Sequence, residues 1–231
     1  MKYSHNSEVD MSDATVSRPK NELQLVQLGR EALAPILESF SALPHTNHAD
    51  GKYRLRRYSV IYFLDDEVKP SDKHDFVQTS DINHFQGDIV RRFEPIEADV
   101  LASTSLKLMC SHFMQANHLP NGQEIEIHQM RVVALMDETP VAPEGVHQDG
   151  FDHIAIIGIA RHNVVGGEVM LYNHDHEAPF FRKVLNDGEM AMLDDHRLWH
   201  NAQPIRAIEP QQDGYMDVMV LTAKEGRNAA H

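Results

Sequence analysis

The sequence lacks the features that mark secreted and membrane proteins. Cys110 is its only cysteine, so no disulfide can form within the chain. No apolar run approaches membrane-spanning length, and the stretch from Met1 to Pro19 has no apolar core of a signal peptide. We therefore expect a protein of the reducing cytoplasm with no membrane partner.

Basic residues are also scarce. The chain has 21 lysines and arginines against 35 aspartates and glutamates, which gives a formal net charge of −14. A surface with this much negative charge repels phosphate groups, so binding to nucleic acid or to an anionic membrane is disfavoured. Composition does not decide whether the chain forms a homo-oligomer.

Helical periodicity is confined to the first half of the chain. Apolar residues recur at three- and four-residue steps from Asn21 to Pro44 and from Glu97 to Asn117, which predicts two helices. The other apolar segments alternate or run continuously, as strands do. The expected strands are Tyr53 to Leu64, Ile89 to Glu94, Ile125 to Met136, Ile154 to Ala160, Val169 to Tyr172, Phe180 to Leu185, Glu189 to Leu193 and Tyr215 to Ala223. The predicted fold class is mainly β with flanking helices: a sandwich or barrel supported by N-terminal helices.

The chain shows no internal repeat and no linker. Residues 1–20 are polar and lack periodicity, so we expect a flexible lead-in there. Residues 21–231 are expected to form a single domain, since one core of this length is common. The polar stretch from Asp65 to Gly87 contains Pro70 and is expected to be a long loop or a short hairpin. It is our candidate for a lid over a bound substrate.

The chain has sixteen histidines, and one motif stands out among them: His147 and Asp149, separated by one residue. Residues two apart in an extended strand share a face, so His147 and Asp149 can reach one ion together. His200 follows the expected strand Glu189 to Leu193 and can supply a third ligand, with His196 as its competitor. Two imidazoles and one carboxylate hold one face of an Fe(II) octahedron and leave positions open for a co-substrate and O₂.

Two segments carry a resemblance to a known family. The block EGVHQDGFDHIAIIGIARHNVVGGEVMLY (Glu144 to Tyr172) and the block MLDDHRLWHNAQPI (Met192 to Ile205) resemble the bacterial Fe(II)/2-oxoglutarate-dependent dioxygenases of the L-isoleucine 4-hydroxylase type. The similarity extends upstream through Tyr53 to Phe63 and through IVRRFEPI (Ile89 to Ile96).

The resemblance implies a fold, a site and a reaction. The fold would be a double-stranded β-helix, or jelly roll, with His147, Asp149 and His200 as the Fe(II) ligands. The co-substrates would be 2-oxoglutarate and O₂, and succinate and CO₂ would be released. The substrate would be a small molecule, a free aliphatic L-amino acid resembling isoleucine, leucine or methionine. A carboxylate at Asp149 indicates a hydroxylase, because related halogenating enzymes carry a small residue there.

Such an enzyme needs a cation for the far carboxylate of 2-oxoglutarate, and the planar guanidinium of arginine suits this task. Arg206, six residues beyond His200, is the first choice, although an arginine on a solvated turn would look the same. Arg131 is the second choice. It could bind the co-substrate or the carboxylate of the amino acid, and a surface salt bridge is the alternative.

Acceptors for the ammonium of an amino acid are less well marked. Glu168 and Asp152 are the candidates, and both could equally be solvated. The basic cluster Arg54, Arg56 and Arg57 is expected mainly to be a solvated strand face, with a carboxylate clamp as the alternative. Trp199 is expected to pack in the core.

The sequence leaves two other functions open. The same chemistry could act on a peptide or on another small metabolite. Alternatively, the chain could be a non-catalytic cupin-like binding protein with structural histidines. Cupins usually carry His-x-His, whereas this chain has Asp149 at the second position, and this difference favours the oxygenase.

Overall fold

The structure is a computed structural model that describes residues 22–73, 75–76, 90–135 and 137–228. The expected lead-in, residues 1–20, lies outside the described residues, as do residues 74 and 77–87 of the candidate lid. Among the residues that are described, no helix is long and apolar enough to cross a membrane.

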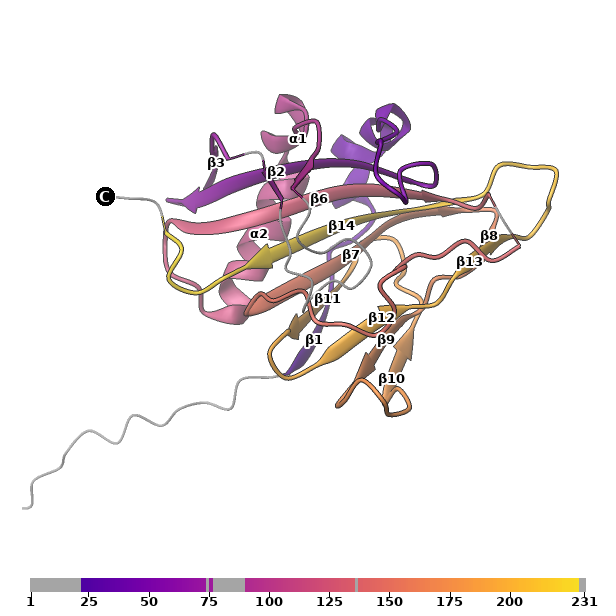
Figure 1. Ribbon diagram of the computed structural model, residues 1–231. Coiled ribbons are helices and arrows are strands. Elements are labelled where there is room, and N and C mark those ends of the chain that lie inside the picture. The colour runs from indigo at the N-terminus through magenta and orange to yellow at the C-terminus, as the bar shows by residue number, and fades with distance from the viewer. Residues whose placement is uncertain (1–21, 74, 77–89, 136, 229–231) are drawn as a thin grey trace, which may run out of the picture.

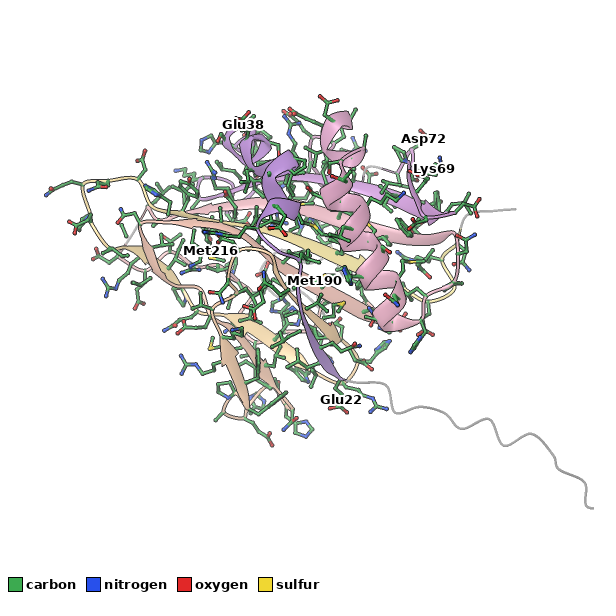
Figure 2. All side chains as sticks on the ribbon, turned by 180° about the vertical axis from the view of Figure 1, so that it is seen from behind. Glu22, Glu38, Lys69, Asp72, Met190 and Met216 are labelled. Carbon is green, nitrogen blue, oxygen red and sulfur yellow. The ribbon has the colours of Figure 1, made fainter. Side chains whose placement is uncertain are left out.

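Antiparallel strands form a sandwich of two layers (Figure 1). The larger sheet has the order β1-β11-β7-β14-β6-β2-β3, and its helix-side face is covered by η1, α1 and α2. The smaller sheet, β10-β9-β12, and the pair β13-β8 lie on the other side of it. This arrangement confirms the mainly β jelly-roll fold with supporting helices. Figure 2 shows the sandwich from behind, with Lys69 on β3 at one edge of the large sheet and Glu22 beside β1 at the other.

The elements have the following bounds: β1 (Leu23–Gln27), η1 (Glu31–Ala42), β2 (Arg54–Leu64), β3 (Glu67–Pro70), β4 (Asp75–Phe76), β5 (Arg91–Arg92), α1 (Ala98–Leu101), α2 (Thr104–Asn117), β6 (Gln123–Val133), β7 (His153–His162), β8 (Val164–Gly166), β9 (Val169–Tyr172), β10 (Phe181–Lys183), β11 (Glu189–Asp194), β12 (Trp199–Ala202), β13 (Ile205–Ala207) and β14 (Tyr215–Ala223). Strand β4 pairs with β5 outside the two main layers.

Successive side chains of the long central strands point alternately toward the helices and toward the space between the sheets. On β2 and β6, Ile61 and Ile127 face the helices and pack in a cluster with Phe113 of α2. Their neighbours Tyr58 and Val60 point the other way, into the space between the sheets. Burying each such apolar side chain contributes roughly 1.5 to 3 kcal/mol, which holds the helices and both sheets together. The inner face is therefore available for a site.

The helix predicted from Asn21 to Pro44 is wrong over its first part. Leu23–Gln27 is an edge strand that pairs with β11, and a 3₁₀-helix, η1, begins only at Glu31. Gly29 separates them with φ of +81°, a backbone conformation that would end a right-handed helix. The partner strand lies far away in sequence, so local periodicity could not reveal this pairing. By contrast, the second predicted helix is present as α1 and α2, and Ser103 caps α2 by accepting from the Leu106 amide.

Candidate metal centre

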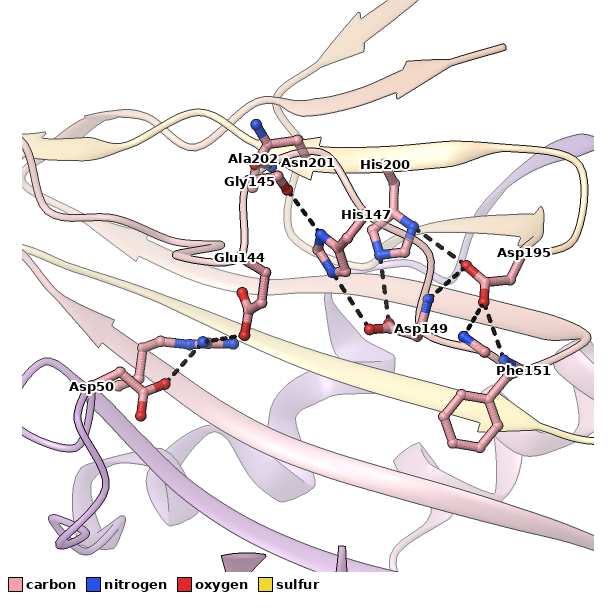
Figure 3. A network of polar contacts seen from close by, with 12 residues as sticks. Asp50, Glu144, Gly145, His147, Asp149, Phe151, Asp195, His200, Asn201 and Ala202 are labelled. Atoms are coloured by element: carbon pink, nitrogen blue, oxygen red, sulfur yellow. Dashed lines mark hydrogen bonds and ion pairs between the residues drawn. The ribbon is translucent and has the colours of Figure 1, made fainter. Parts of the chain in front are cut away.

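The three candidate ligands come from two segments that the backbone joins directly. His147 and Asp149 lie in the connection between β6 and β7, and His200 lies on β12. The His147 amide donates to the His200 carbonyl and the His200 amide donates to the His147 carbonyl, both at 2.9 Å. This antiparallel bridge fixes the spacing of the two imidazoles, which lie side by side in Figure 3 with their ring centroids 4.3 Å apart.

Both imidazoles present the same nitrogen to the same carboxylate. Nε2 of His147 lies 3.4 Å from Oδ1 of Asp149, and Nε2 of His200 lies 3.4 Å from Oδ2. The three ligand atoms all lie within 4.8 Å of one another. Atoms that bind one metal ion at about 2.1 Å stand roughly 3 to 3.5 Å apart, so the geometry fits a shared ion. Two imidazoles with one carboxylate are also the donor set that suits Fe(II) with open coordination positions.

Each of the other two ring nitrogens faces an oxygen atom of the protein. Nδ1 of His147 donates to the Gly145 carbonyl at 2.8 Å, so Nε2 of the neutral ring keeps its lone pair for a metal. Nδ1 of His200 lies 3.5 Å from Oδ1 of Asp195. A carboxylate behind a ligating histidine is a common means of fixing the orientation of the ring.

Asp195 is a residue of the centre that the sequence reasoning missed. Its buried carboxylate accepts the backbone amides of Asp149 at 3.1 Å, Gly150 at 2.8 Å and Phe151 at 3.1 Å (Figure 3). It therefore holds the turn that carries Asp149, and it also faces His200, which lies on β12. No local pattern distinguishes it from Asp194, because its burial depends on the fold.

The ionisation of these groups shows that the site attracts a cation. Burial raises the pKa of Asp149, but hydrogen bonds from His147 and His200 outweigh it and hold that pKa well below its usual range. Burial lowers the pKa of His147, but the Asp149 carboxylate overcomes this effect and raises it to about 9. Burial raises the pKa of Asp195 to about 6. The field that keeps a proton on His147 would also favour a metal cation.

The three ligands open into a cavity of about 140 Å³ between the two sheets. One part of its wall is apolar and the other part carries charge. The apolar lining includes Phe151, Ile154, Ile156, Val169, Leu185, Val218 and Val220. The charged lining includes Arg54, Arg56, Arg91, His128 and Glu144. The cavity therefore suits a small molecule with an aliphatic part and an ionic part.

The expectation of a solvated basic face on β2 is wrong for two of the three arginines. Arg54 and Arg56 are only 8% and 5% exposed and point into the cavity, because residues two apart on β2 share its inner face. Arg57 points to the opposite face and pairs with Glu94 and Glu97. The alternation was visible in the sequence, but which face would be buried was not.

A β-bulge turns a further arginine toward the cavity. In the pairing of β7 with β14, Gly158 faces Val218 and Ala160 faces Asp217, so Ile159 is an extra residue on β7. Beyond the bulge the alternation is reversed, and Arg161 lies beside Met216 on the cavity side. Its Nη2 donates to the Gly166 carbonyl at 2.7 Å, and among the described residues no carboxylate lies within 4 Å of it.

The structure does not bring the two predicted co-substrate arginines to the cavity. Arg206 is exposed on β13, opposite exposed Val165 of β8. Arg131 lies on the helix-side face of β6, where it donates to both carboxylate oxygens of Asp217 at 2.7 and 2.8 Å. The planar fork of Arg131 is thus occupied by an ion pair within the sheet.

The two predicted ammonium acceptors also lie outside the cavity lining. Glu168 is half-buried between β8 and β9. Asp152 accepts the Glu225 amide at 2.6 Å and contacts Nε2 of His196. This contact holds His196 at the surface, so the metal-ligand geometry is found with His200 and not with its competitor. Trp199 is half-buried next to His200.

The fold is shared with several solved structures. A bsmA homologue from Methylobium petroleophilum superposes with a TM-score of 0.71 at 23% identity, covering 87% of this chain and 83% of that one. IDO from Bacillus thuringiensis gives a TM-score of 0.69 at 17% identity, covering 87% and 88%. TqaL, an Fe(II)/α-ketoglutarate-dependent dioxygenase, gives 0.61 at 13% identity, covering 91% and 86%. None of the curated proteins compared with the sequence matches it.

The family is given by the sequence itself. Residues 37–222 match the profile of the 2OG-Fe dioxygenase family, and this span includes all three candidate ligands and the whole cavity lining. Members of that family use Fe(II), 2-oxoglutarate and O₂, which agrees with the donor set of the metal centre. The chain belongs to the 2OG-Fe dioxygenase family.

Proposed function

We propose that this protein is an Fe(II)- and 2-oxoglutarate-dependent hydroxylase of a free aliphatic L-amino acid. The observation that carries the proposal is the convergence of His147, Asp149 and His200 at the wall of a small cavity. Fe(II) held by these residues, together with 2-oxoglutarate and O₂, would supply the oxidation of an unactivated C–H bond, with release of succinate and CO₂.

The protein's own residues prepare that chemistry. Gly145 and Asp195 orient the two imidazoles, so that both Nε2 atoms meet the Asp149 carboxylate. The apolar wall next to the centre excludes water from the reacting carbon and positions an aliphatic chain there. The expected cytoplasmic location, which follows from the single cysteine, would supply the reducing conditions that keep iron ferrous.

Arg161 is our assignment for the cation that binds the far carboxylate of 2-oxoglutarate, in place of Arg206 and Arg131. It lines the cavity, its guanidinium is half-buried, and its hydrogen-bond partner is a backbone carbonyl and not an acid. Burial lowers the pKa of Arg161, so a carboxylate placed against it would be favourable.

The lining of the cavity supports a small substrate. Beside the metal centre, the cavity is lined by apolar side chains that suit a short aliphatic chain. An apolar wall beside a charged wall favours the free amino acid over the peptide alternative, because a free amino acid carries both of its charges at one end of an aliphatic chain. The charged wall accounts for the ionic part of such a molecule.

Iron binding and turnover test the proposal together. Under argon, we expect the wild-type protein to bind one Fe(II) per chain, and His147→Ala, Asp149→Ala and His200→Ala to lose most of that binding, since each removes one of three ligands. His196→Ala is the matched control and should bind iron as the wild type does.

In air, wild-type protein with 2-oxoglutarate should form succinate and add one oxygen atom to an aliphatic amino acid in a screen of the proteinogenic L-amino acids. Unchanged iron binding in the three ligand variants would instead support structural histidines in a cupin-like protein. Succinate formation stimulated only by peptides would contradict the substrate class while leaving the chemistry in place.

A further inference from the structure

The charged end of the cavity contains more ionised groups than the metal centre and the co-substrate require. Arg54 and Arg56 lie there on β2, with Arg91 from β5 beside them. Asp50 and Glu144 approach from two loops. Buried charges are costly unless each is paired, so their pairing shows what a ligand would have to supply.

The guanidinium of Arg54 is occupied by partners within the protein. Its Nη1 donates to Asp50 Oδ2 at 2.8 Å and to Glu144 Oε1 at 3.3 Å (Figure 3). Its Nε faces the sulfur of Met130 at 3.4 Å. Arg54 therefore ties both carboxylates in place and has little capacity left for a ligand.

Arg56 has much poorer partners. It is 5% exposed, yet its nearest carboxylate oxygen in the described part of the chain is Asp50 Oδ2 at 3.6 Å, which already accepts from Arg54. The one acceptor for its Nη2 among these residues is the thioether sulfur of Met130, at 3.6 Å. Burial, followed by the charge of Arg54, lowers the pKa of Arg56 to about 9. Its guanidinium carbon also lies 5.1 Å from the centroid of the Phe93 ring. A ligand carboxylate at this position would provide a closer anionic partner than any that the described residues supply.

Glu144 carries the opposite charge and lines the same cavity as Arg56. Its side chain is 8% exposed, and Arg54 is the one cation within 4 Å of it among the described residues. Burial raises its pKa, but Arg54 and then His147 lower it further, so the group is ionised at neutral pH. Figure 3 shows Glu144 between Asp50 and the metal ligands His147 and Asp149, where a second cationic group could meet it.

We propose that this end of the cavity binds the head group of a zwitterionic substrate, with Arg56 pairing with the α-carboxylate and Glu144 accepting from the α-ammonium. The inference rests on the proposed function and names the residues that recognise its substrate class. The aliphatic side chain would then lie along Ile154, Ile156 and Val220, beside the metal centre. A dicarboxylate without an amino group would place a second carboxylate against that of Glu144, and the two would repel each other. Arg56 and Glu144 together therefore select an amino acid.

The test separates the two anionic ligands of the cavity. We would measure binding of 2-oxoglutarate, and then of L-leucine, L-isoleucine and L-methionine, by calorimetry on Fe(II)-loaded protein under argon, and KM for each in air. Arg56→Gln should weaken amino-acid binding at least tenfold, since a charge-assisted bidentate pair is lost, and change 2-oxoglutarate binding by less than about twofold. Arg57→Gln, on the opposite face of the same strand, is the matched control and should alter neither.

Substrate analogues identify which charged group of the amino acid each residue binds. The wild type should prefer L-leucine to L-leucinamide, and Arg56→Gln should lose this preference whereas Arg56→Lys should retain part of it. Glu144→Gln should lose the preference of the wild type for L-leucine over 4-methylpentanoate, which lacks the amino group. Thermal unfolding of each variant checks that the fold is retained.

The outcomes distinguish this inference from the proposed function. If Arg56→Gln weakens 2-oxoglutarate and spares the amino acid, or if both preferences survive in the variants, the head-group assignment is overturned while the hydroxylase stands. If the wild type turns over no amino acid at all, the proposed function itself fails.

Discussion

At the scale of single residues, Asp195 shows how one buried carboxylate can set the geometry of a metal centre. It accepts three consecutive backbone amides of the turn that carries Asp149, and it faces Nδ1 of His200. Its role is positioning, since it lies behind the ligands and does not reach the cavity lining.

Replacing Asp195 with asparagine should therefore lower Fe(II) affinity about 10- to 100-fold, as expected when an outer-shell partner is lost. The turn loses a charged acceptor, so the free energy of unfolding should also fall by roughly 1 to 3 kcal/mol. Fe(II) titration and thermal unfolding measure the two effects, with Asp194→Asn as the neighbouring control. Wild-type iron affinity in Asp195→Asn would show that the backbone bridge alone positions the ligands.

The same scale shows what the sequence could and could not predict. His147 and Asp149 share a face because they are two apart in an extended segment, so local geometry sufficed for them, and the structure places His200 with them. Asp195 and Glu144 escaped because a buried acid looks like a solvated one until the fold is known. Arg206 was chosen for its distance in sequence from His200, but its face of β13 is exposed.

At the scale of elements, the bulge at Ile159 decides which side of β7 Arg161 occupies. A regular strand would place Arg161 on the helix-side face with Ile157. Alternation read from the sequence is reliable only until such an extra residue appears. Strand β1 escaped prediction for a related reason, since its pairing with β11 spans most of the chain.

Arg161→Gln should weaken 2-oxoglutarate binding about 10- to 100-fold, because one charged, two-pronged partner is lost, while Fe(II) binding is unchanged. Deletion of Ile159 should reproduce this loss without changing the arginine, provided that its unfolding transition remains cooperative. The measurement is 2-oxoglutarate titration of Fe(II)-loaded protein under argon. Normal 2-oxoglutarate affinity in Arg161→Gln would contradict the assignment, whatever the deletion does.

At the scale of the whole molecule, an ionic cluster around the buried Glu126 joins the larger sheet to the last described segment of the chain. The carboxylate of Glu126 accepts from the Tyr58 hydroxyl at 2.7 Å and from Nη1 of Arg227 at 2.9 Å. Burial raises the pKa of Glu126 above its ordinary value of 4.5, although Tyr58 and Arg227 both act to lower it. The folded state therefore binds the proton of Glu126 more tightly than the unfolded state does. As a result, the contribution of Glu126 to the free energy of unfolding falls as the pH rises above 4.5.

Arg227→Met should therefore destabilise the protein more at about pH 8 than at about pH 5, where Glu126 is more readily protonated. The arginine is partly exposed, so we expect a loss of about 1 kcal/mol at the higher pH. Urea unfolding at both pH values measures it. Arg206→Met, which removes an exposed arginine, is the control and should show no such pH dependence. Equal losses at both pH values would place the effect in packing and not in charge.

The central claim is that His147, Asp149 and His200 together hold Fe(II) in a form that binds 2-oxoglutarate. Absorption spectroscopy under argon tests this most directly, because the Fe(II)–2-oxoglutarate complex has a weak visible charge-transfer band. We expect the band in wild-type protein and in His196→Ala, and its loss in Asp149→Ala and His200→Ala. A wild-type protein without the band, or ligand variants that retain it, would contradict the account.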